Sequence, residues 1–176
     1  MDTNVLAGRL MRVLRFDASV YREVAADTNA MSQAAIVVIV AAILNALGVL
    51  GLGGLIVVVS AIASLVGFAV YTGVATLISK NLFQGRTDFN EMGRTLGFAY
   101  AWYGLGILGL IPLGGILAFL GLIAAAVAGV IALRESSEFD TMKAVITVVI
   151  SAIIAGAINF CATGPLLAMI GLSAAG

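Results

Sequence analysis

The sequence lacks most of the side chains that enzymes and metalloproteins use. It contains no histidine, a single cysteine at Cys161, and only nine basic and nine acidic residues among 176. Without histidine, imidazole acid–base catalysis and histidine-ligated zinc or haem are excluded. A lone cysteine excludes an intrachain disulfide framework. Neither a nucleophile–base pair nor a metal-ligand cluster is visible, so we expect no enzymatic activity, no metal and no cofactor.

Charge is also missing from most of the chain. Residues 28–79, 95–133 and 144–176 contain no Asp, Glu, Lys or Arg, and 62% of all residues are hydrophobic. A helix crosses the apolar layer of a bilayer with about 20 residues. The first two runs are each long enough for two crossings and the third for one. A soluble domain of this composition would expose an aggregation-prone surface, so we predict an integral membrane protein.

Glycine and proline divide these runs into helices. Four glycines within 48–54 predict one turn, Pro112 with Gly114 and Gly115 predicts another, and Gly164-Pro165 is expected to end or kink the last helix. The predicted fold is an all-α bundle of five transmembrane helices, formed by a domain of residues 29–176. The crossings are expected at about 30–47, 55–78, 90–111, 116–133 and 141–163.

The segment before the first crossing, residues 1–28, is predicted to be cytoplasmic and amphipathic. Within 5–16, apolar and basic residues fall on opposite sides of a helix. We expect this helix to lie in the membrane interface, with its basic side in contact with lipid phosphates. The basic side carries Arg9, Arg12 and Arg15, and the apolar side Leu6, Leu10, Val13 and Leu14. The alternative is an ordinary short helix packed on the rest of the protein.

The basic residues set the expected orientation. Five crossings place the N-terminus and both charged loops on one side, where all nine Lys and Arg residues fall. The positive-inside rule makes that side cytoplasmic, so the C-terminus is expected outside the cell's inner (plasma) membrane. We expect no cleavable signal peptide, because the first apolar run starts only after 27 mixed residues.

A short phrase occurs twice, each time before a predicted outward-going helix. "TDFNEM" begins at Thr87 and "SEFDTM" begins at Ser137. Acidic side chains in each copy suit the free N–H groups and the positive dipole end of a helix start. Convergent helix-start chemistry explains this match. The alternative is an internal repeat that forms a shared cytoplasmic docking surface.

Uncharged polar and aromatic residues mark a possible mid-membrane pocket. Tyr100, Trp102 and Tyr103 fall near the middle of the third predicted crossing, where a phenol needs a polar partner. Asn45 and Asn159 are candidates for that partner. The functional interpretation is a pocket for a lipid or small ligand. The alternative is an aromatic core between helices.

Small residues predict where helices meet. Gly121, Ala125 and Gly129 recur every four residues, a spacing that brings them to one helix face and allows close helix approach. These residues are therefore expected to pack against another helix, of the same chain or of a second one.

The order of these segments resembles a known family. "RLMRVLRFDASVYREVAAD", "LFQGRTDFNEMGRTLGFAYA", "GLIPLGG" and "IALRESSEFDTMKAV" together look like bacterial members of the Yip (Ypt-interacting protein) family. The resemblance covers nearly the whole chain and implies five helices with a cytoplasmic N-terminus. In eukaryotes it implies links to Rab-type GTPases, membrane trafficking and the shaping of curved membranes, often in hetero-oligomers. The sequence differs from those relatives in lacking a "DLYGP" motif.

The leading functional hypothesis is a non-enzymatic membrane scaffold. Such a protein would organise the membrane, act in a trafficking-like role or serve as a small subunit of a membrane complex. Its expected partners are membrane lipids and other integral membrane proteins or further copies of itself, and no nucleic acid. The alternative is a channel or carrier for a neutral or lipidic substrate.

Overall fold

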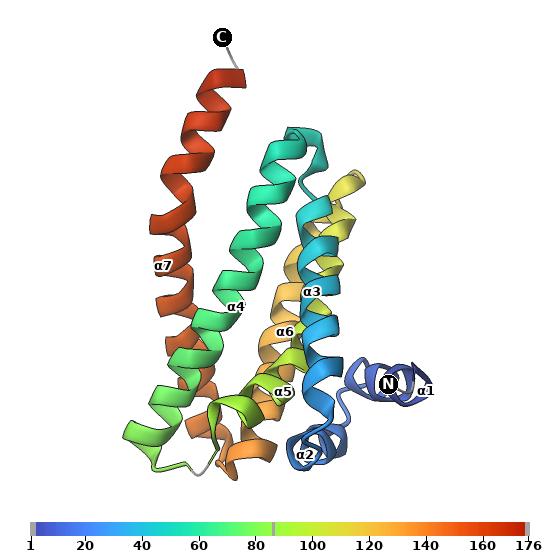
Figure 1. The fold of residues 1–176 in the computed structure, drawn as a ribbon, viewed down its shortest axis with the longest axis vertical. Coiled ribbons are helices and arrows are strands. Elements are labelled where there is room, and N and C mark those ends of the chain that lie inside the picture. Colours follow the sequence, from blue (N-terminus) through green and yellow to red (C-terminus); the bar gives the residue numbers. More distant parts are fainter. Residues whose placement is uncertain (1–2, 86, 175–176) are drawn as a thin grey trace.

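The computed structural model describes residues 3–85 and 87–174, except that the side chains of residues 162 and 166–174 lie outside the description. Within these ranges the chain is helical and contains no strand. Among the described residues, four helices are long and apolar enough to cross a membrane (Figure 1). They are α3 (Ala30–Leu47), α4 (Gly54–Phe83), α6 (Gly114–Ser137) and α7 (Thr141–Ala174), the last through its Thr141–Cys161 part.

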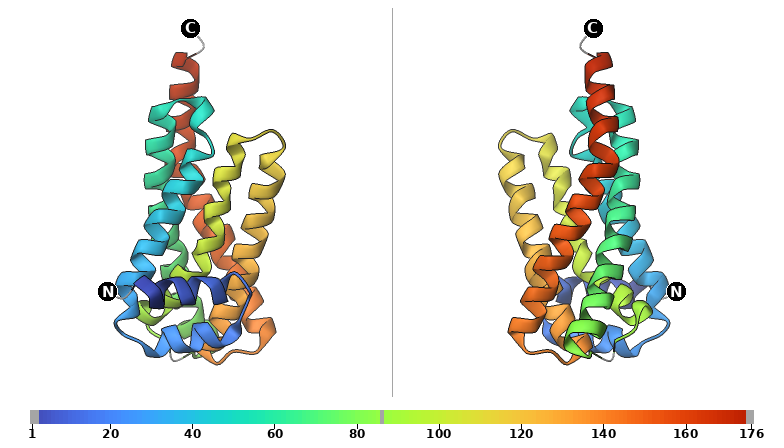
Figure 2. Two further views of the ribbon diagram at one scale, coloured as in Figure 1. Left: turned by 90° about the vertical axis from the view of Figure 1, so that its right-hand side faces the viewer. Right: turned by 90° about the vertical axis from the view of Figure 1, so that its left-hand side faces the viewer.

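The segment expected to form the third crossing is divided into two elements. Residues Phe89–Ala99 form the α-helix α5, and residues Tyr100–Leu110 continue as η2, a 3₁₀ helix of 11 residues. The pair runs from the charged end of the molecule to the opposite end, beside α3 and α6 (Figures 1 and 2). A 3₁₀ helix satisfies its backbone hydrogen bonds within the segment.

The winding of η2 arranges its side chains in rows. With three residues per turn, residues three apart are eclipsed, so Tyr100, Tyr103, Gly106 and Gly109 form a single row. A Cβ atom built on Gly106 would lie 2.8 Å from the Cα atom of Asn45 in α3, and one built on Gly109 would lie 2.7 Å from the Gly48 carbonyl oxygen. The glycines of this row therefore allow backbone-to-backbone packing of η2 on the end of α3.

Two short helices precede the long ones. Helix α1 spans Thr3–Val13 and α2 spans Ala18–Ala26, where Asp17 caps the start by accepting from the Ser19 amide. Helix α1 lies crosswise to the long helices, and α2 lies at the tip of the same end (Figure 2). Both pack on α5, and α2 also packs on α6. The chain ends Met1 and Gly176, on which the predicted orientation depends, lie outside the described residues.

The turns at the two ends differ in polarity. At the end away from α1 and α2, the apolar η1 turn (Leu50–Leu52) joins α3 to α4, and a second turn joins η2 to α6 (Figure 1). Gly53 at φ 112° and Leu113 at φ 63° reverse the chain there. The α4–α5 and α6–α7 connections lie at the other end. The charged residues that the structure describes in the turns between the long helices lie in these two connections, as the charge pattern of the sequence predicts.

The buried core lies in the charged half of the molecule. Its largest fully buried side chains come from α2, α5 and α6 and include Tyr21, Met92, Leu96, Phe98 and Leu133. The long helices beyond this core expose large apolar side chains, among them Leu55, Leu113 and Phe160. Such exposure is unfavourable in water and is typical of helices surrounded by lipid.

Candidate functional site

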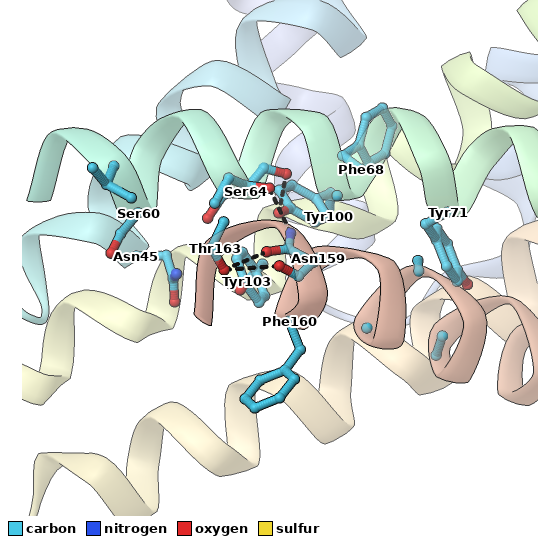
Figure 3. Close-up of a pocket in the computed structure, with 16 residues that line it drawn as sticks. Asn45, Ser60, Ser64, Phe68, Tyr71, Tyr100, Tyr103, Asn159, Phe160 and Thr163 are labelled. Atoms are coloured by element: carbon cyan, nitrogen blue, oxygen red, sulfur yellow. Dashed lines mark hydrogen bonds between the residues drawn. The ribbon is translucent and has the colours of Figure 1, made fainter. Parts of the chain in front are cut away.

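A cavity of about 490 Å³ lies between α4, α7, η2 and the end of α3. Four of the five residues predicted to form a mid-membrane pocket line it, namely Asn45, Tyr100, Tyr103 and Asn159 (Figure 3). These residues come from three helices far apart in the sequence, and the fold brings them to one place. The fifth residue, Trp102, does not line the cavity.

The cavity follows the length of α4. Ser60 and Asn45 lie at one end, Tyr100 and Asn159 near the centre, and Tyr71 at the other end (Figure 3). At 1.5 Å per residue, Ser60 is about 9 Å and Tyr71 about 25 Å from the start of α4 at Gly54. The cavity therefore extends from near the uncharged end to the middle of this candidate span.

Part of the polar lining is satisfied inside the protein. The Tyr100 hydroxyl donates to the Ser64 carbonyl at 3.2 Å, and the Asn159 side-chain amide donates to the Ala63 carbonyl at 2.7 Å. Thr163 donates to the Asn159 backbone carbonyl at 2.8 Å. The rings of Tyr100 and Tyr103 stack with centroids 4.7 Å apart, because the 3₁₀ winding eclipses them.

Another part of the lining has no partner. Among the described residues, the side chains of Asn45, Ser60 and Tyr103 line the cavity and form no hydrogen bond with another residue. An amide or hydroxyl without a partner costs about 1–3 kcal/mol when it is removed from water. These groups can therefore bind polar atoms that enter the cavity.

Trp102 has a different role from the one predicted. Its ring stacks on Phe16 with centroids 5.0 Å apart and an angle of 12° between the planes. Within the described part of the chain, its indole N–H is buried without a partner. Trp102 therefore joins the loop after α1 to η2 and takes no part in the cavity.

Sequence reasoning did not assign Ser60, Ser64, Phe68 and Tyr71 of α4 to the pocket. Their spacings of four, four and three residues place them on one face of a helix, and all four line the cavity. On α7, Ala152, Gly156, Asn159 and Thr163 are spaced by four, three and four residues and also line it. The sequence signal for these lining residues of α4 and α7 is the recurrence of polar and small residues on one face of an apolar helix.

The charged end contains a buried arginine network. Arg9 is 6% exposed, and its guanidinium donates to Glu23 at 2.9 Å, Asp27 at 2.8 Å and Gln33 at 2.8 Å. One side chain thus joins α1 to α2 and α3. Arg9 does not occupy the lipid-facing position expected of it, because the acids of α2 and its C-cap attract it to the interior.

The other two arginines predicted to contact lipid lie nearer the surface. Arg12 donates to Asp17 at 3.0 Å and to Ser19 at 2.9 Å, and also pairs with Glu23. Arg15 is exposed. The bonds from Ser19 and Arg12 lower the pKa of Asp17 to about 2. Arg12 and then Arg9 lower the pKa of Glu23, and Arg9 lowers that of Asp27.

The two copies of the repeated phrase meet in space but do not match in structure. The Thr87 and Ser137 hydroxyls, which open the two copies, lie 2.8 Å apart. Asp88 caps α5 through the Glu91 amide at 2.7 Å, whereas Asp140 accepts from the Lys143 amide at 2.8 Å. The capping acids stand at different positions of the phrase, which favours helix-start chemistry over an internal repeat.

The predicted small-residue face of α6 packs within the chain. A Cβ atom on Gly121 would lie 2.6 Å from the Leu105 Cβ of η2, and one on Gly129 would lie 3.2 Å from the Tyr71 hydroxyl of α4. Ala125 lies between them beside a small apolar groove.

Comparisons with protein-family models, curated proteins and solved structures find no match to this chain.

Proposed function

We propose that this protein is a non-enzymatic integral membrane scaffold with five crossings, of the type suggested by its resemblance to the Yip family. In this proposal, α5 and η2 together form the third crossing between α3 and α6. The charged end faces the cytoplasm, and α1 lies in the membrane interface. The proposed role is to organise the membrane or to hold a partner within a membrane complex.

The observation that carries the proposal is the crosswise placement of α1 together with the large apolar side chains that it leaves exposed. Most of the predicted apolar side is not among them, because Leu6, Leu10 and Val13 pack on the core, as in the alternative of a short helix packed on the rest of the protein. Val5 and Met11 of α1 and Leu14 directly after it are 42%, 59% and 48% exposed. The ion pairs of Arg9 with Glu23 and Asp27 hold α1 crosswise to the long helices (Figure 2). A helix held in this way can bury its exposed apolar side chains at the headgroup boundary of the inner leaflet.

The test is the depth of α1 in a lipid bilayer. A fluorophore attached to Met11→Cys, in the Cys161→Ser background, is expected to be quenched by lipids that carry a spin label near the headgroup. The same fluorophore at Ala26→Cys, on the exposed end of α2, should be quenched mainly by a water-soluble quencher. Equal quenching of both positions from water would contradict the interfacial placement of α1.

A second candidate function is transport of a neutral or lipidic substrate, as a channel or carrier. The cavity favours this transport function, because one continuous space is lined by four of the predicted pocket residues, namely Asn45, Tyr100, Tyr103 and Asn159. Reconstituted vesicles should then show faster transbilayer movement of an uncharged lipid than protein-free vesicles. An unchanged rate would contradict the transport function, and the scaffold role would remain as the proposed function.

A further inference from the structure

We propose that the cavity between α4, α7 and η2 is a binding site for a neutral glycerolipid whose head carries hydroxyl and ester groups, such as a diacylglycerol. This inference rests on the membrane placement of α4 and α7 proposed above, and names the ligand class of the second candidate function. It concerns binding, which a scaffold can use as well as a carrier.

The lining of the cavity selects an uncharged head. Within the described part of the chain, none of the residues that line it is acidic or basic. A phosphate or ammonium group would therefore enter a low-dielectric space without a counter-charge, which is strongly unfavourable. A hydroxyl or ester group instead finds donors and acceptors that lack partners in the protein, on Asn45, Ser60 and Tyr103 (Figure 3).

The surroundings of the cavity suit acyl chains. A groove of about 220 Å³ between α4 and α7 shares Ala63, Gly67 and Asn159 with the cavity and is otherwise lined mainly by valine, isoleucine and alanine. A second groove of about 150 Å³ shares Tyr71, Tyr100 and Tyr103 with the cavity and continues toward α6.

A cavity with polar groups that lack partners and an apolar groove on either side matches a compact polar head with two chains. The chains would lie in the grooves, and the head would lie against the groups without partners in the cavity. A ligand with no polar head would leave those groups unpaired, so the arrangement favours an amphiphile over a plain hydrocarbon.

A single substitution can block the cavity and leave its other lining residues unchanged. A Cβ atom on Gly156 meets no other atom within 4 Å, although Gly156 lines the cavity. Gly156→Leu therefore places a side chain in the open space. Ala157→Leu is the matched control, because Ala157 is the next residue of the same helix, is exposed and lines none of the three spaces. Tyr103→Phe removes one hydroxyl and keeps the ring.

The experiment uses the full chain in phosphatidylcholine vesicles with a photoactivatable diacylglycerol that carries a clickable tag. We expect labelling of peptides from α4 and α7, competed by unlabelled diacylglycerol and not by phosphatidic acid. Gly156→Leu should reduce labelling at least five-fold, Tyr103→Phe about three-fold, and Ala157→Leu should leave it unchanged. Variants are compared only if they elute as one species and unfold at the temperature of the parent protein.

The outcomes separate this inference from the proposed function. Equal labelling of Gly156→Leu and Ala157→Leu, or equal competition by phosphatidic acid, would overturn the neutral-lipid site and leave the membrane placement standing. Reaction of cysteines at Ile62 and Ile153, both exposed on α4 and α7, with a water-soluble maleimide would overturn the membrane placement itself.

Discussion

At the scale of single residues, Arg9 bonds α1 to α2, its C-cap and α3. Replacing it with methionine keeps an unbranched apolar stem and removes the bonds to Glu23, Asp27 and Gln33. Glu23 and Asp27 stay partly in water, at 41% and 31% side-chain exposure, so they are rehydrated and the loss is moderate. We expect the docking of α1 to weaken by about 2 kcal/mol.

Hydrogen exchange of the α1 amides measures this loss. Arg9→Met should raise the exchange of α1 and leave that of α6 unchanged. Arg15→Met is the control, because Arg15 is exposed, and it should change the docking free energy by no more than about 0.5 kcal/mol. Equal exchange in the two variants would show that packing alone holds α1.

The carboxylates around Arg9 and Arg12 predict the pH dependence of the same contact. A carboxylate with a lower pKa in the folded state stabilises it above the unfolded pKa of about 4, and the contribution is lost as pH falls through the folded pKa. For Asp17 that pKa is about 2, and the pKa values of Glu23 and Asp27 are lowered as well. The docking of α1 should therefore be constant from about pH 7 to pH 5 and loosen between about pH 4 and pH 2.

Spin labels at Met11 and Ser32 report the distance between α1 and α3 over this range. We expect its distribution to broaden only in the acidic window. A second pair at Ile39 and Ile62, on the exposed surfaces of α3 and α4, should keep its distribution at every pH. Broadening already between about pH 7 and pH 5 would mean that other groups control the contact.

At the scale of elements, the junction between η2 and α3 leaves no room for added atoms. A methyl group on Gly106 would lie 2.8 Å from the Asn45 Cα atom and closer still to its side-chain amide. Because backbone cannot rotate away as a side chain can, Gly106→Ala should destabilise the protein by about 2–3 kcal/mol. Gly115→Ala is the control, since a Cβ atom there meets nothing within 4 Å. Thermal unfolding in detergent compares them, and equal midpoints would contradict the close approach.

The sequence predicted the long helices better than their local geometry. Uncharged length and glycine-rich turns located α3, α4, α6 and the start of α7, because a bilayer imposes a minimum apolar length that composition reveals directly. The division of 90–111 at Tyr100 was not predicted. Within the divided segment, Gly106 and Gly109 pack closely on α3, and such a contact between distant segments leaves no local mark in the sequence pattern.

The sequence also predicted the candidate site only in part. Asn45, Tyr100, Tyr103 and Asn159 were grouped by the rarity of polar groups in apolar helices, and the structure brings them together. Trp102 differs because the 3₁₀ winding turns its row toward α6, away from the tyrosines, and leaves it beside Phe16. The inward turn of Arg9 was missed because its acidic partners lie 14 and 18 residues away and meet it only in the folded chain.

At the scale of the whole molecule, the predicted topology places the two ends in different compartments. In intact cells, an impermeant maleimide should label Leu52→Cys and Leu113→Cys, which are exposed in the turns at the uncharged end. It should label Lys80→Cys and Met142→Cys only in inverted membrane vesicles, because the positive-inside rule places the charged end in the cytoplasm. Labelling of Leu113→Cys and Met142→Cys from one side would contradict the predicted crossing by α6.

The tight winding of η2 links the shape of the cavity to the length of one helix. A 3₁₀ helix rises about 2.0 Å and turns about 120° per residue, against about 1.5 Å and 100° for an α-helix. Rewinding its 11 residues into α form would shorten the segment by roughly 5 Å and turn Tyr103 by about 60° relative to Tyr100. The orientation of Tyr103 relative to Tyr100 and the distance of Pro112 from Tyr100 along the helix axis thus depend on the same helical pitch, so a change in one entails a change in the other.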